Sequence, residues 1–521
     1  MKLLAPLAQP RDPVWRWFVA ALTAVTLLRL IGIGQWPLSG DEAYHWEWAL
    51  RPQLGYYDHP PLHAWSMFLS TSVFGHSAWA IRLPNVLAST AMVLVLVAFA
   101  RRLGRGSDLS AAASDRAAGW TGLIALLSPL HTAFAVYATG DAWVSLMWSW
   151  ALWAGWIALE QGRARDWLHL GVALGCGVLA KFLILPLGLA LALTVLLLPP
   201  YRRHLLRWQP WLLLPALAVV ISPLLWWNWH HDWLTFAFNF AIRLREDGQW
   251  YQEIPLYLGS QMAAVTPLVW IFGVIAVTRM LLDRTQPAGL RYCAIVILVP
   301  LLIFLKNSFT RRIGLHWPAI AYPALYVLLP LAWERGWCAP RWRRTTVIIP
   351  AVITGLALIV ASIPPRWSVL PFMPPAGSAE TAPAGETLGL PELAAIIRER
   401  RQRHQAESPT HTPVFLCSAQ YGFLAFLRFA LDAEPILLWD KPLPHGQQHR
   451  MWDDWGLHQG EDALFLTGKP SRLKSVATKL SDHFASVGEP EQTDIVVDGH
   501  LVNRIWIVPC RGFDGRKPEW E

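Results

Sequence analysis

Long runs of apolar residues recur along the first two thirds of the chain, from Trp15 almost to Pro364. Most of these runs are long enough to cross roughly 30 Å of hydrocarbon as a helix. Polar residues are concentrated in short connections between the runs and in the last third of the chain. The pattern predicts an all-α polytopic membrane bundle, followed by a domain that lies outside the membrane.

The apolar runs predict about eleven transmembrane helices. The first run, Trp15 to Ile33, is too long for the core of a signal peptide and lacks an A-x-A cleavage site, so we expect a retained span. The region between Leu168 and Pro200 is the least certain, because one long run must supply two short helices. The expected limits are 14–36, 78–100, 118–139, 142–160, 167–183, 184–200, 210–228, 256–278, 292–306, 315–333 and 345–364.

Composition and charge strengthen the membrane assignment. Hydrophobic residues make up 54% of the chain and charged residues only 15%, against about a quarter in soluble domains. The net charge of +8 requires no nucleic-acid partner, because arginines gather in short connections, as is typical of cytoplasmic loops. An odd number of spans then puts the C-terminus on the opposite, external side. The arginine-rich connections are 101–116, 163–165, 202–207, 279–291 and 335–344.

The connections divide the chain into a transmembrane domain at 1–364, a Pro/Gly/Ala-rich linker at 365–390 and an external domain at 391–521. Within the transmembrane domain, 37–77 and 228–255 form external loops. The sequence of the external domain predicts helices at 391–403, 421–431 and 471–484 and strands at 413–419, 462–468, 494–499 and 502–509. This alternation of helices and strands is typical of a small α/β domain. Cys417 and Cys510 both lie in this domain and are candidates for a disulfide bond.

The first external loop concentrates ionisable residues between two hydrophobic helices. They are Asp41, Glu42, His45, Glu47, Asp58, His59 and His63. Ser39 and Glu42 form a capping-box pattern, which predicts that a helix starts here. Asp41 would lie in its first turn, where the helix dipole favours an ionised carboxylate able to act as a general base. Two structural alternatives remain open: Asp41 only stabilises the dipole, and Glu42 only binds the backbone amide of Ser39.

The second half of the loop reads YYDHPPLHAW and includes Tyr57, Asp58 and His59. A residue before proline favours extended backbone, and proline is accepted in the first turn of a helix. We therefore expect an extended segment that enters a short interfacial helix. A phosphate at its mouth would be bound by charged His59, by helix amides, or by both. The alternative is that Asp58 caps the helix and His59 is a solvated loop residue.

These segments resemble the first loop of bacterial polyprenyl-phosphate-sugar-dependent glycosyltransferases, which include the lipid A aminoarabinose and galacturonic acid transferases and relatives of the protein O-mannosyltransferases. The shared features are the DE pair after span one, YYDHPPL, and RLP at the start of span two. GDAWVSLMW, LAKF, LLWWNWHHDWLTFAF and HWPAIAY follow in the family's order, and SAQYGFLAFL and RMWDDW resemble its C-terminal region. The resemblance covers most of the chain.

The resemblance implies the class C glycosyltransferase (GT-C) fold, with the site at the external membrane face. Asp41 matches the proposed base that deprotonates the acceptor, and Glu42 matches an acidic neighbour that orients the acceptor or binds a metal. His59 occupies the position of a donor-phosphate-binding lysine in the aminoarabinose transferases. This difference matters because histidine is only partly charged near neutral pH.

Other residues are candidates for a supporting role. Lys181, at the outer end of a span, either binds the donor phosphate or extends to the interface. Arg243 and Arg245 lie in the second external loop, and Arg311 and Arg312 precede a later span; all are candidate phosphate ligands or solvated residues. Arg82 is expected to anchor the start of span two, Asp141 to cap the fourth span, and His316 to lie near the outer surface.

Taken together, these observations predict an inverting glycosyltransferase at the periplasmic face of a bacterial inner membrane. The donor would be a polyprenyl-phosphate sugar and the acceptor a lipid, a glycan or a protein, with membrane lipids as surroundings and the oligomeric state unassigned. No cofactor is required and no metal site is assigned, although a divalent metal remains possible; His230, His231 and Asp232 lack ligand spacing. The alternative is a polytopic transporter or lipid flippase, which would spread ionisable residues along mid-membrane helices.

Overall fold

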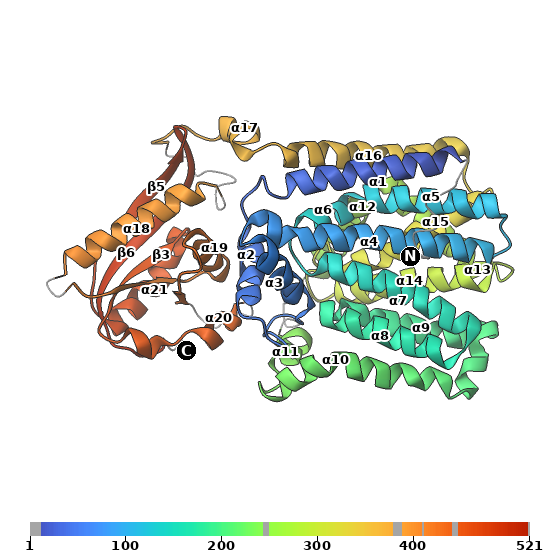
Figure 1. Cartoon of the computed structure of the whole chain (residues 1–521), viewed down its shortest axis with the longest axis horizontal. Coiled ribbons are helices and arrows are strands. Elements are labelled where there is room, and N and C mark those ends of the chain that lie inside the picture. Colours follow the sequence, from blue (N-terminus) through green and yellow to red (C-terminus); the bar gives the residue numbers. More distant parts are fainter. Residues whose placement is uncertain (1–11, 243–248, 379–387, 409–410, 440–445, 519–521) are drawn as a thin grey trace. The chain divides into compact units, whose positions relative to one another are not determined.

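The computed structural model describes residues 12–242, 249–378, 388–408, 411–439 and 446–518, and its chain divides into two compact units. The bundle unit comprises Met1–Ile33, Gln53–Gly55 and His59–Ser362. The sheet unit comprises Gly34–Pro52, Tyr56–Asp58 and Ile363–Glu521. The segment 37–77 therefore contributes to both units (Figure 1).

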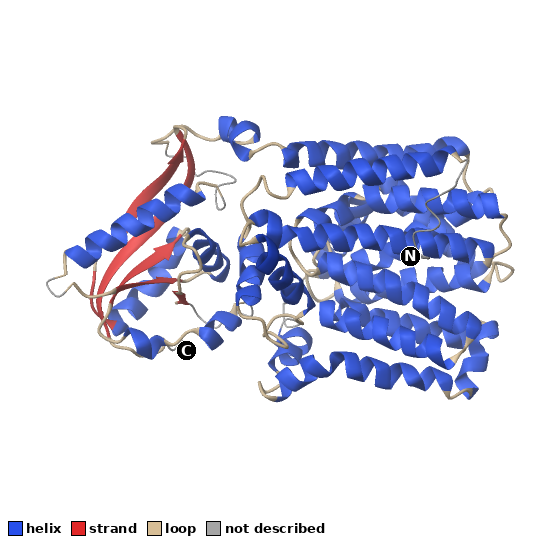
Figure 2. Cartoon of the chain, in the orientation of Figure 1, coloured by secondary structure: helices blue, strands red, loops and turns tan. Residues whose placement is uncertain are grey.

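Helices make up the bundle unit (Figure 2). Those of the first half are α1 (Pro13–Gly32), α3 (Leu62–Phe74), α4 (Ala78–Arg105), α5 (Ala111–Leu127), α6 (Pro129–Val136), α7 (Asp141–Gln161), α8 (Ala164–Ala180) and α9 (Leu185–Leu197). Those of the second half are α10 (Leu213–Trp229), α11 (Leu234–Ala237), α12 (Trp250–Val265), α13 (Pro267–Leu282), α14 (Ala288–Asn307), α15 (Tyr322–Glu334) and α16 (Pro340–Ser362).

The described helices bear out a polytopic membrane bundle but not a specific number of spans. Six helices are individually long and apolar enough to cross a membrane, and three bent helix pairs raise the number to as many as nine. The expected segment 167–183 folds as α8, and 315–333 folds as the turn Trp317–Ala321 followed by α15; neither is among the six helices. The expected single span 256–278 is instead two helices, α12 and α13, bent by 104°.

Two of the three bends between described helix pairs have identifiable causes. Between α12 and α13, Thr266 has φ +75° and Pro267 begins the second helix, so the helical hydrogen-bond ladder stops at this point. Between α5 and α6, which are bent by 60°, Pro129 follows Ser128 in extended backbone. Proline provides no backbone N–H, so each break leaves carbonyl oxygens without helical partners.

Side chains from neighbouring helices satisfy the carbonyls at the α5–α6 break. Arg29 of α1 donates to the Leu126 carbonyl at 3.1 Å and to Thr132 at 2.8 Å. Thr354 of α16 donates to the Leu127 carbonyl at 2.8 Å. Arg29 is only 1% exposed, and in a low-dielectric interior such donors replace the water that would otherwise solvate the carbonyls.

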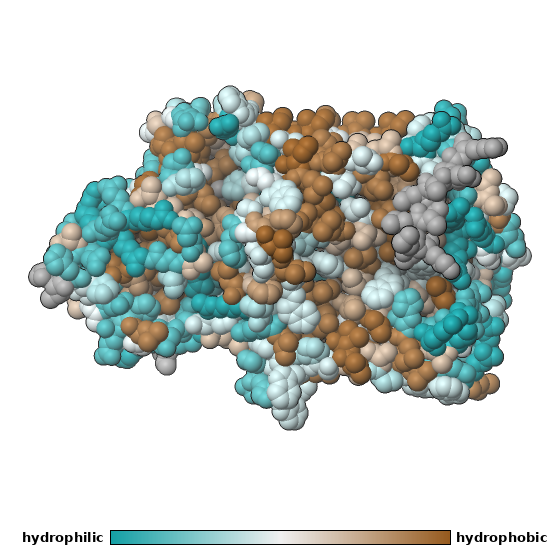
Figure 3. Space-filling view, viewed as in Figure 1, coloured by the Kyte–Doolittle hydropathy of each residue, from teal (hydrophilic) through white to brown (hydrophobic). Residues whose placement is uncertain are grey.

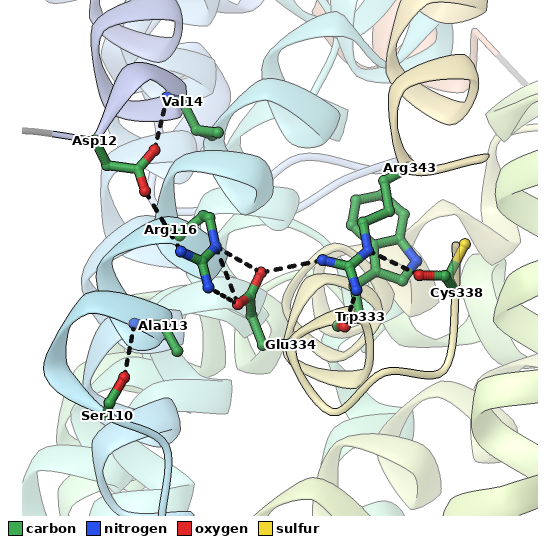
Figure 4. A network of polar contacts seen from close by, with 9 residues as sticks. All are labelled: Asp12, Val14, Ser110, Ala113, Arg116, Trp333, Glu334, Cys338 and Arg343. Carbon is green, nitrogen blue, oxygen red and sulfur yellow. Dashed lines mark hydrogen bonds and ion pairs between the residues drawn. The ribbon is translucent and has the colours of Figure 1, made fainter. Parts of the chain in front are cut away.

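At one end of the bundle, an ion-pair network joins four helices (Figure 4). Arg116 of α5 contacts Asp12, the N-cap of α1, at 3.6 Å and forms a bidentate pair with Glu334 at the end of α15. Arg343 of α16 binds Glu334 at 3.5 Å and the Cys338 carbonyl at 2.9 Å. All these arginines belong to connections that the sequence assigns to the cytoplasm, so this end of the bundle carries the positive-inside signature.

The flanks of the bundle expose large apolar side chains (Figure 3). Leu356 and Val352 of α16 and Val219 of α10 are each more than half exposed. Continuous exposed apolar surface of this extent is unusual for a soluble protein and is what a lipid-facing surface requires.

The sheet unit contains a six-stranded mixed sheet with strand order β2-β1-β3-β6-β4, and β5 also pairs with β6. Its strands are β1 (Val414–Ser418), β2 (Ile436–Leu438), β3 (Asp462–Thr467), β4 (Phe484–Val487), β5 (Glu491–Val497) and β6 (His500–Phe513). Its helices are α2 (Gly40–Leu50), α17 (Pro365–Ser368), α18 (Leu390–Ala406), α19 (Tyr421–Ala430), α20 (Gln447–Trp452) and α21 (Pro470–His483). The predicted α/β domain is confirmed, whereas β2, β4 and α20 were not predicted.

Helices cover both faces of this sheet. Leu416 of β1 packs in one core with residues of α18 and α19, while its neighbours Phe415 and Cys417 pack in a second core with residues of α21. This alternation follows from the two-residue period of a strand. Cys417 and Cys510 are both buried and free, so the suggested disulfide is not formed. Part of the expected linker, 379–387, lies outside the described residues.

Candidate functional site

The sheet unit positions Asp41 at the start of helix α2. The predicted capping box is present: Ser39 Oγ accepts from the Glu42 amide at 3.2 Å, and Glu42 accepts from the Ser39 amide at 3.0 Å. Asp41 is exposed in the first turn. Its Oδ1 accepts a hydrogen bond from the Tyr421 hydroxyl at 3.2 Å. An accessible carboxylate at a helix N-terminus is suited to accept a proton from a hydroxyl.

Glu42 closes the capping box in this arrangement. Its side chain is 1% exposed and its Oε2 is bound to the Ser39 amide. This contact is the one expected if Glu42 serves the helix cap. Asp41, in contrast, is exposed to solvent.

A buried charged cluster lies further along α2. Glu47 forms ion pairs with Arg428 of α19 and with His449 of α20, each at 3.0 Å. Arg428 also donates to the Ile436 carbonyl at 2.5 Å and contacts Asp453 at 3.4 Å. Burial opposes ionisation of Glu47, but Arg428 and His449 outweigh it and hold the pKa of Glu47 below its ordinary value. Burial raises the pKa of Asp453, and Arg428 offsets this only partly.

Tyr57 and Asp58 are also held within the sheet unit. The Tyr57 amide donates to Gln448 Oε1 at 2.7 Å. Asp58 is 1% exposed, and its Oδ2 accepts from the Tyr44 hydroxyl at 2.5 Å. Burial, and then the charge of Asp58, raise the pKa of Tyr44 well above its ordinary value, so Tyr44 remains a donor. The alternative that Asp58 caps the next helix is wrong, because Pro61 is the N-cap of α3 and no side chain caps it.

In the bundle unit, a second set of candidates surrounds Lys181. This residue ends α8 in extended backbone, at a break before the following helical turn. Its Nζ lies 2.8 Å from Asp141 Oδ1, and the other oxygen of Asp141 accepts from Thr139 at 2.9 Å. The Lys181 side chain is 12% exposed. A paired lysine at this position is held in place instead of extending freely to the interface.

Lys181 and His59 line a cavity of about 410 Å³ in the bundle unit. Asn239, Asn307 and Arg311 add polar groups to it. The remaining lining is apolar and aromatic: Phe182, Leu183, Leu185, Pro186, Leu189, Phe240, Ile303, Phe304 and Trp317. The cavity thus combines cationic groups with an extended apolar wall, which suits a ligand that has an anionic head and a hydrocarbon tail.

Arg311 has an unusual environment in this cavity. Its Nε and Nη1 atoms are buried and have no hydrogen-bond partner among the described residues. The next residue, Arg312, is exposed and does not line the cavity. Arg311 as a whole is half-buried, and a guanidinium whose inner nitrogens lack a partner is stabilised when an anion binds it.

The remaining predicted residues have varied positions. His316 lies before the turn Trp317–Ala321 and interacts electrostatically with Asp141. Arg82 donates to the Ile33 carbonyl at 2.9 Å and so ties α4 to the end of α1. His63 bonds the Ala138 carbonyl at 3.0 Å. Arg243 and Arg245 belong to 243–248, which lies outside the described residues.

Sequence reasoning missed several residues of these sets. Arg428, His449 and Asp453 were not singled out, although Arg428 is a lone charge in the otherwise apolar segment YGFLAFLRFAL. Such a charge within an apolar helix face is a detectable signal of a buried pair. Tyr421 gives no comparable signal, because a tyrosine at a helix start is unremarkable. Within the described residues, no cluster of three or more His, Cys, Asp or Glu side chains has an arrangement able to hold a metal.

Comparisons with known proteins find membrane-bound sugar transferases as relatives. Residues 58–227 match the profile of the family described as dolichyl-phosphate-mannose-protein mannosyltransferase. The lipid A galacturonosyltransferase RgtD of Rhizobium johnstonii is 28% identical over 345 residues, which is 64% of this chain and 67% of that protein. The undecaprenyl phosphate-alpha-4-amino-4-deoxy-L-arabinose arabinosyl transferase of Pseudomonas paraeruginosa is 30% identical over 320 residues, 59% of this chain. The match spans only half of that transferase.

The fold is that of a solved bacterial transferase. ArnT from Cupriavidus metallidurans, in the apo state, aligns with a TM-score of 0.60 over 95% of this chain and 98% of its own, at 18% identity. The same protein bound to undecaprenyl phosphate aligns with a TM-score of 0.60 over 97% of this chain and 99% of its own, at 17% identity.

Fold and relatives together define an integral membrane glycosyltransferase. The chain is similar to polyprenyl-phosphate sugar transferases and shares the GT-C fold, in agreement with the resemblance of its sequence. The transferase interpretation is thereby confirmed over that of a transporter or flippase.

Proposed function

We propose that this protein transfers a sugar from a polyprenyl-phosphate carrier to a hydroxyl group of a lipid acceptor, with inversion at the anomeric carbon. The observation that carries the proposal is the cavity of the bundle unit, in which Lys181, His59 and Arg311 line the same space as an extended apolar wall. A soluble nucleotide sugar has no hydrocarbon chain that could pack against this apolar wall, whereas an isoprenoid tail would bury its apolar surface there.

The cations of the cavity suit the leaving group of this reaction. A polyprenyl-phosphate sugar is a phosphodiester with one negative charge, and breaking its glycosidic bond releases a monoester whose charge approaches two at neutral pH. Lys181 is partly neutralised by Asp141, but Arg311 has no ion-pair partner among the described residues. Preorganised cations of this kind stabilise the charge that develops in the transition state.

Asp41 completes the proposed reaction. The oxygen of the acceptor hydroxyl attacks the anomeric carbon, the bond from that carbon to the phosphate oxygen breaks, and polyprenyl phosphate leaves with the electron pair. The hydroxyl proton passes to Asp41, which is exposed at the start of α2. Attack from the side opposite the leaving group inverts the anomeric centre.

The topology supports the periplasmic face of a bacterial inner membrane as the place of reaction. The ion-pair network of Asp12, Arg116, Glu334 and Arg343 marks one end of the bundle, and the arginine-rich connections assign that end to the cytoplasm. Helix α1 starts at this end and is followed by the loop that carries Asp41, so the loop is external in this orientation. The related transferases suggest 4-amino-4-deoxy-L-arabinose or galacturonic acid as the sugar and lipid A as the acceptor; another glycan or a protein is the alternative acceptor.

A matched pair of arginine variants tests the proposed donor. Arg311→Ala removes the buried guanidinium of the cavity, whereas Arg312→Ala removes its exposed neighbour. Purified protein in detergent would be titrated with undecaprenyl phosphate. We expect Arg311→Ala to raise the dissociation constant about tenfold or more, since hydrogen bonds from charged groups contribute about 1.5–3 kcal/mol.

Two controls distinguish loss of the phosphate contact from a general loss of binding. Arg312→Ala should bind undecaprenyl phosphate as the wild type does, and undecaprenol, which lacks the phosphate, should bind both arginine variants and the wild type equally. If Arg311→Ala binds undecaprenyl phosphate with wild-type affinity, the cavity does not hold the donor phosphate and the proposal loses its main support.

A further inference from the structure

Two helices that are far apart in the sequence run side by side within the sheet unit. Helix α2 belongs to the first loop, and α19 lies some 380 residues later. Near their N-termini the backbones touch, because a Cβ added at Gly40 would lie 2.7 Å from the Gly422 carbonyl oxygen. Near their C-termini, Glu47 pairs with Arg428 at 3.0 Å. The helices are therefore parallel and fixed to one another at both ends.

The close approach of the glycines brings one side chain from each helix together. Asp41 follows Gly40 directly, and Tyr421 directly precedes Gly422. The Tyr421 hydroxyl lies 3.2 Å from Asp41 Oδ1 and donates to it. Only glycine at position 40 permits this spacing, since any larger residue would displace the backbone of α19.

The side chain of Tyr421 has two close neighbours. It stands edge to face with Tyr44, with ring centroids 5.2 Å apart, and Tyr44 is itself held by its hydrogen bond to Asp58. Gly446 is a second neighbour of the side chain: a Cβ added there would lie 2.5 Å from the Cβ of Tyr421, and Gly446 has φ +84°. The phenol is thus supported by surrounding groups and not by its bond to Asp41 alone.

We propose that Tyr421 is a positioning residue for the Asp41 carboxylate, so that the C-terminal part of the chain supplies a side chain to the reaction. This inference rests on the proposed function, in which Asp41 is the base. By donating to Oδ1, Tyr421 restricts rotation of the carboxylate and leaves Oδ2 for the acceptor hydroxyl. Tyr421 keeps its own proton throughout, and the proton of the acceptor goes to Asp41.

Other titratable groups near Asp41 do not share this contact. Glu42 faces the Ser39 amide, and the imidazole of His45 bonds the backbone carbonyl of Asp41. Tyr421 is the described residue of α19 whose polar group meets the Asp41 carboxylate. Its removal therefore changes the orientation of the base without removing a charge.

The test compares Tyr421→Phe with Tyr56→Phe. Tyr421→Phe keeps the ring that packs on Tyr44 and loses only the donor. Tyr56→Phe loses a hydroxyl that binds the carbonyls of Trp48 and Arg51 at the other end of α2. Transfer from undecaprenyl-phosphate 4-amino-4-deoxy-L-arabinose and undecaprenyl-phosphate galacturonic acid to lipid A would be measured in detergent, with thermal unfolding of each variant.

We expect Tyr421→Phe to lower kcat about tenfold with the KM for the donor unchanged, the size expected for loss of one hydrogen bond to a carboxylate. Tyr56→Phe should keep kcat and show only a lower unfolding temperature. A Gly40→Ala variant, which separates the helices, should reproduce the loss of kcat. If Tyr421→Phe retains wild-type kcat, or if KM changes in place of kcat, the positioning role is wrong.

The Asp41→Asn variant distinguishes failure of the positioning role of Tyr421 from failure of the base role of Asp41. If it abolishes transfer while Tyr421→Phe transfers like the wild type, only the role of Tyr421 fails. If Asp41→Asn itself transfers at the wild-type rate, the base assigned in the proposed function is wrong and the positioning inference falls with it.

Discussion

In the bundle unit, the charged side chains of the candidate site stand at the edge of an apolar cavity, and one of them, Arg311, has buried donors without a partner among the described residues. In the sheet unit, the charged side chains instead pair with one another: Glu47, Arg428, His449 and Asp453 form one buried cluster further along the chain from the exposed Asp41. Single atoms of this cluster, Glu47 Oε1, Arg428 Nε and His449 Nε2, have no hydrogen-bond partner within the described part of the chain, but each side chain has an ion-pair partner within the cluster. The first arrangement is suited to bind an external anion, whereas the second is suited to hold one carboxylate in place.

Because of this difference, we expect substitutions in the two units to change different measured quantities. Substitutions in the bundle set should weaken the binding of a phosphate-bearing lipid. Substitutions in the sheet set should affect turnover at Asp41 or the stability of the unit, with little effect on lipid binding. Measuring lipid binding, turnover and stability for each variant tests whether the two units differ in this way.

Asp41→Asn should have the largest effect on activity. Loss of a general base lowers kcat by about 10²- to 10⁴-fold, while the shape of the first turn of α2 is retained because asparagine is accepted near a helix N-terminus. Undecaprenyl phosphate should bind this variant as it binds the wild type. An affinity for undecaprenyl phosphate that falls in parallel with kcat would show that the two units do not divide binding and turnover as we infer.

Removing one partner of the buried pair should destabilise the sheet unit. Arg428→Met leaves buried Glu47 with His449 as its remaining ion-pair partner and also removes the contact to Asp453. Removing one partner of a buried pair costs about 3–5 kcal/mol. Thermal unfolding in detergent, followed by a probe in the sheet unit, measures this change. Arg398→Met, which removes an exposed pair with Asp432, is the matched control and should have little effect.

The stabilisation by Glu47 should depend on pH with a definite sign. Because the pKa of Glu47 is held below its ordinary value of 4.5, the pair stabilises the fold above pH 4.5 and this stabilisation is lost as the pH falls through the folded pKa. Glu47→Gln should therefore lower the unfolding temperature more at pH 7 than at pH 4. An equal or larger difference at pH 4 would show that Glu47 is not ionised in the fold.

Lys181→Met tests the bundle set independently of Arg311. We expect the dissociation constant for undecaprenyl phosphate to rise about ten- to a hundredfold, because one charge-assisted contact is lost. The change also leaves Asp141 buried without its partner. The double variant Lys181→Met with Asp141→Asn should regain stability but not affinity; recovery of affinity in the double variant would assign Lys181 a purely structural role.

The sequence predicted the regions with periodic or local signals better than those that depend on tertiary contacts. The apolar runs predict the bundle, and the capping box at Ser39 and Glu42 correctly places the start of α2. The bend between α12 and α13 was missed, although Pro267 was visible, because a proline within an apolar run is also compatible with a mildly kinked span. The two short strands β2 and β4, of three and four residues, carry too little pattern to be distinguished from loops.

The candidate site shows the same limit. Lys181 was singled out from local sequence because it is an ionisable residue at the end of an apolar run. Asp41 and His59 became candidates through the capping box and through the resemblance of their segments to the family's first loop. Tyr421 and Arg428 lie some 380 residues from their partners, and no local pattern relates them. Only the parallel contact of α2 and α19 makes their association visible.

Substitutions of Glu42 should have the smallest effects on transfer and stability, and they distinguish a capping role of this residue from a catalytic one. Glutamine supports a capping box as glutamate does, so Glu42→Gln should leave both transfer and stability close to those of the wild type. Glu42→Ala removes the bond to the Ser39 amide and should lower stability by about 1 kcal/mol without a specific loss of kcat. Thermal unfolding and transfer kinetics of the two variants measure this directly. A large loss of kcat in Glu42→Gln would mean that Glu42 takes part in the chemistry through its charge, so that the division between a structural Glu42 and a reactive Asp41 would have to be abandoned.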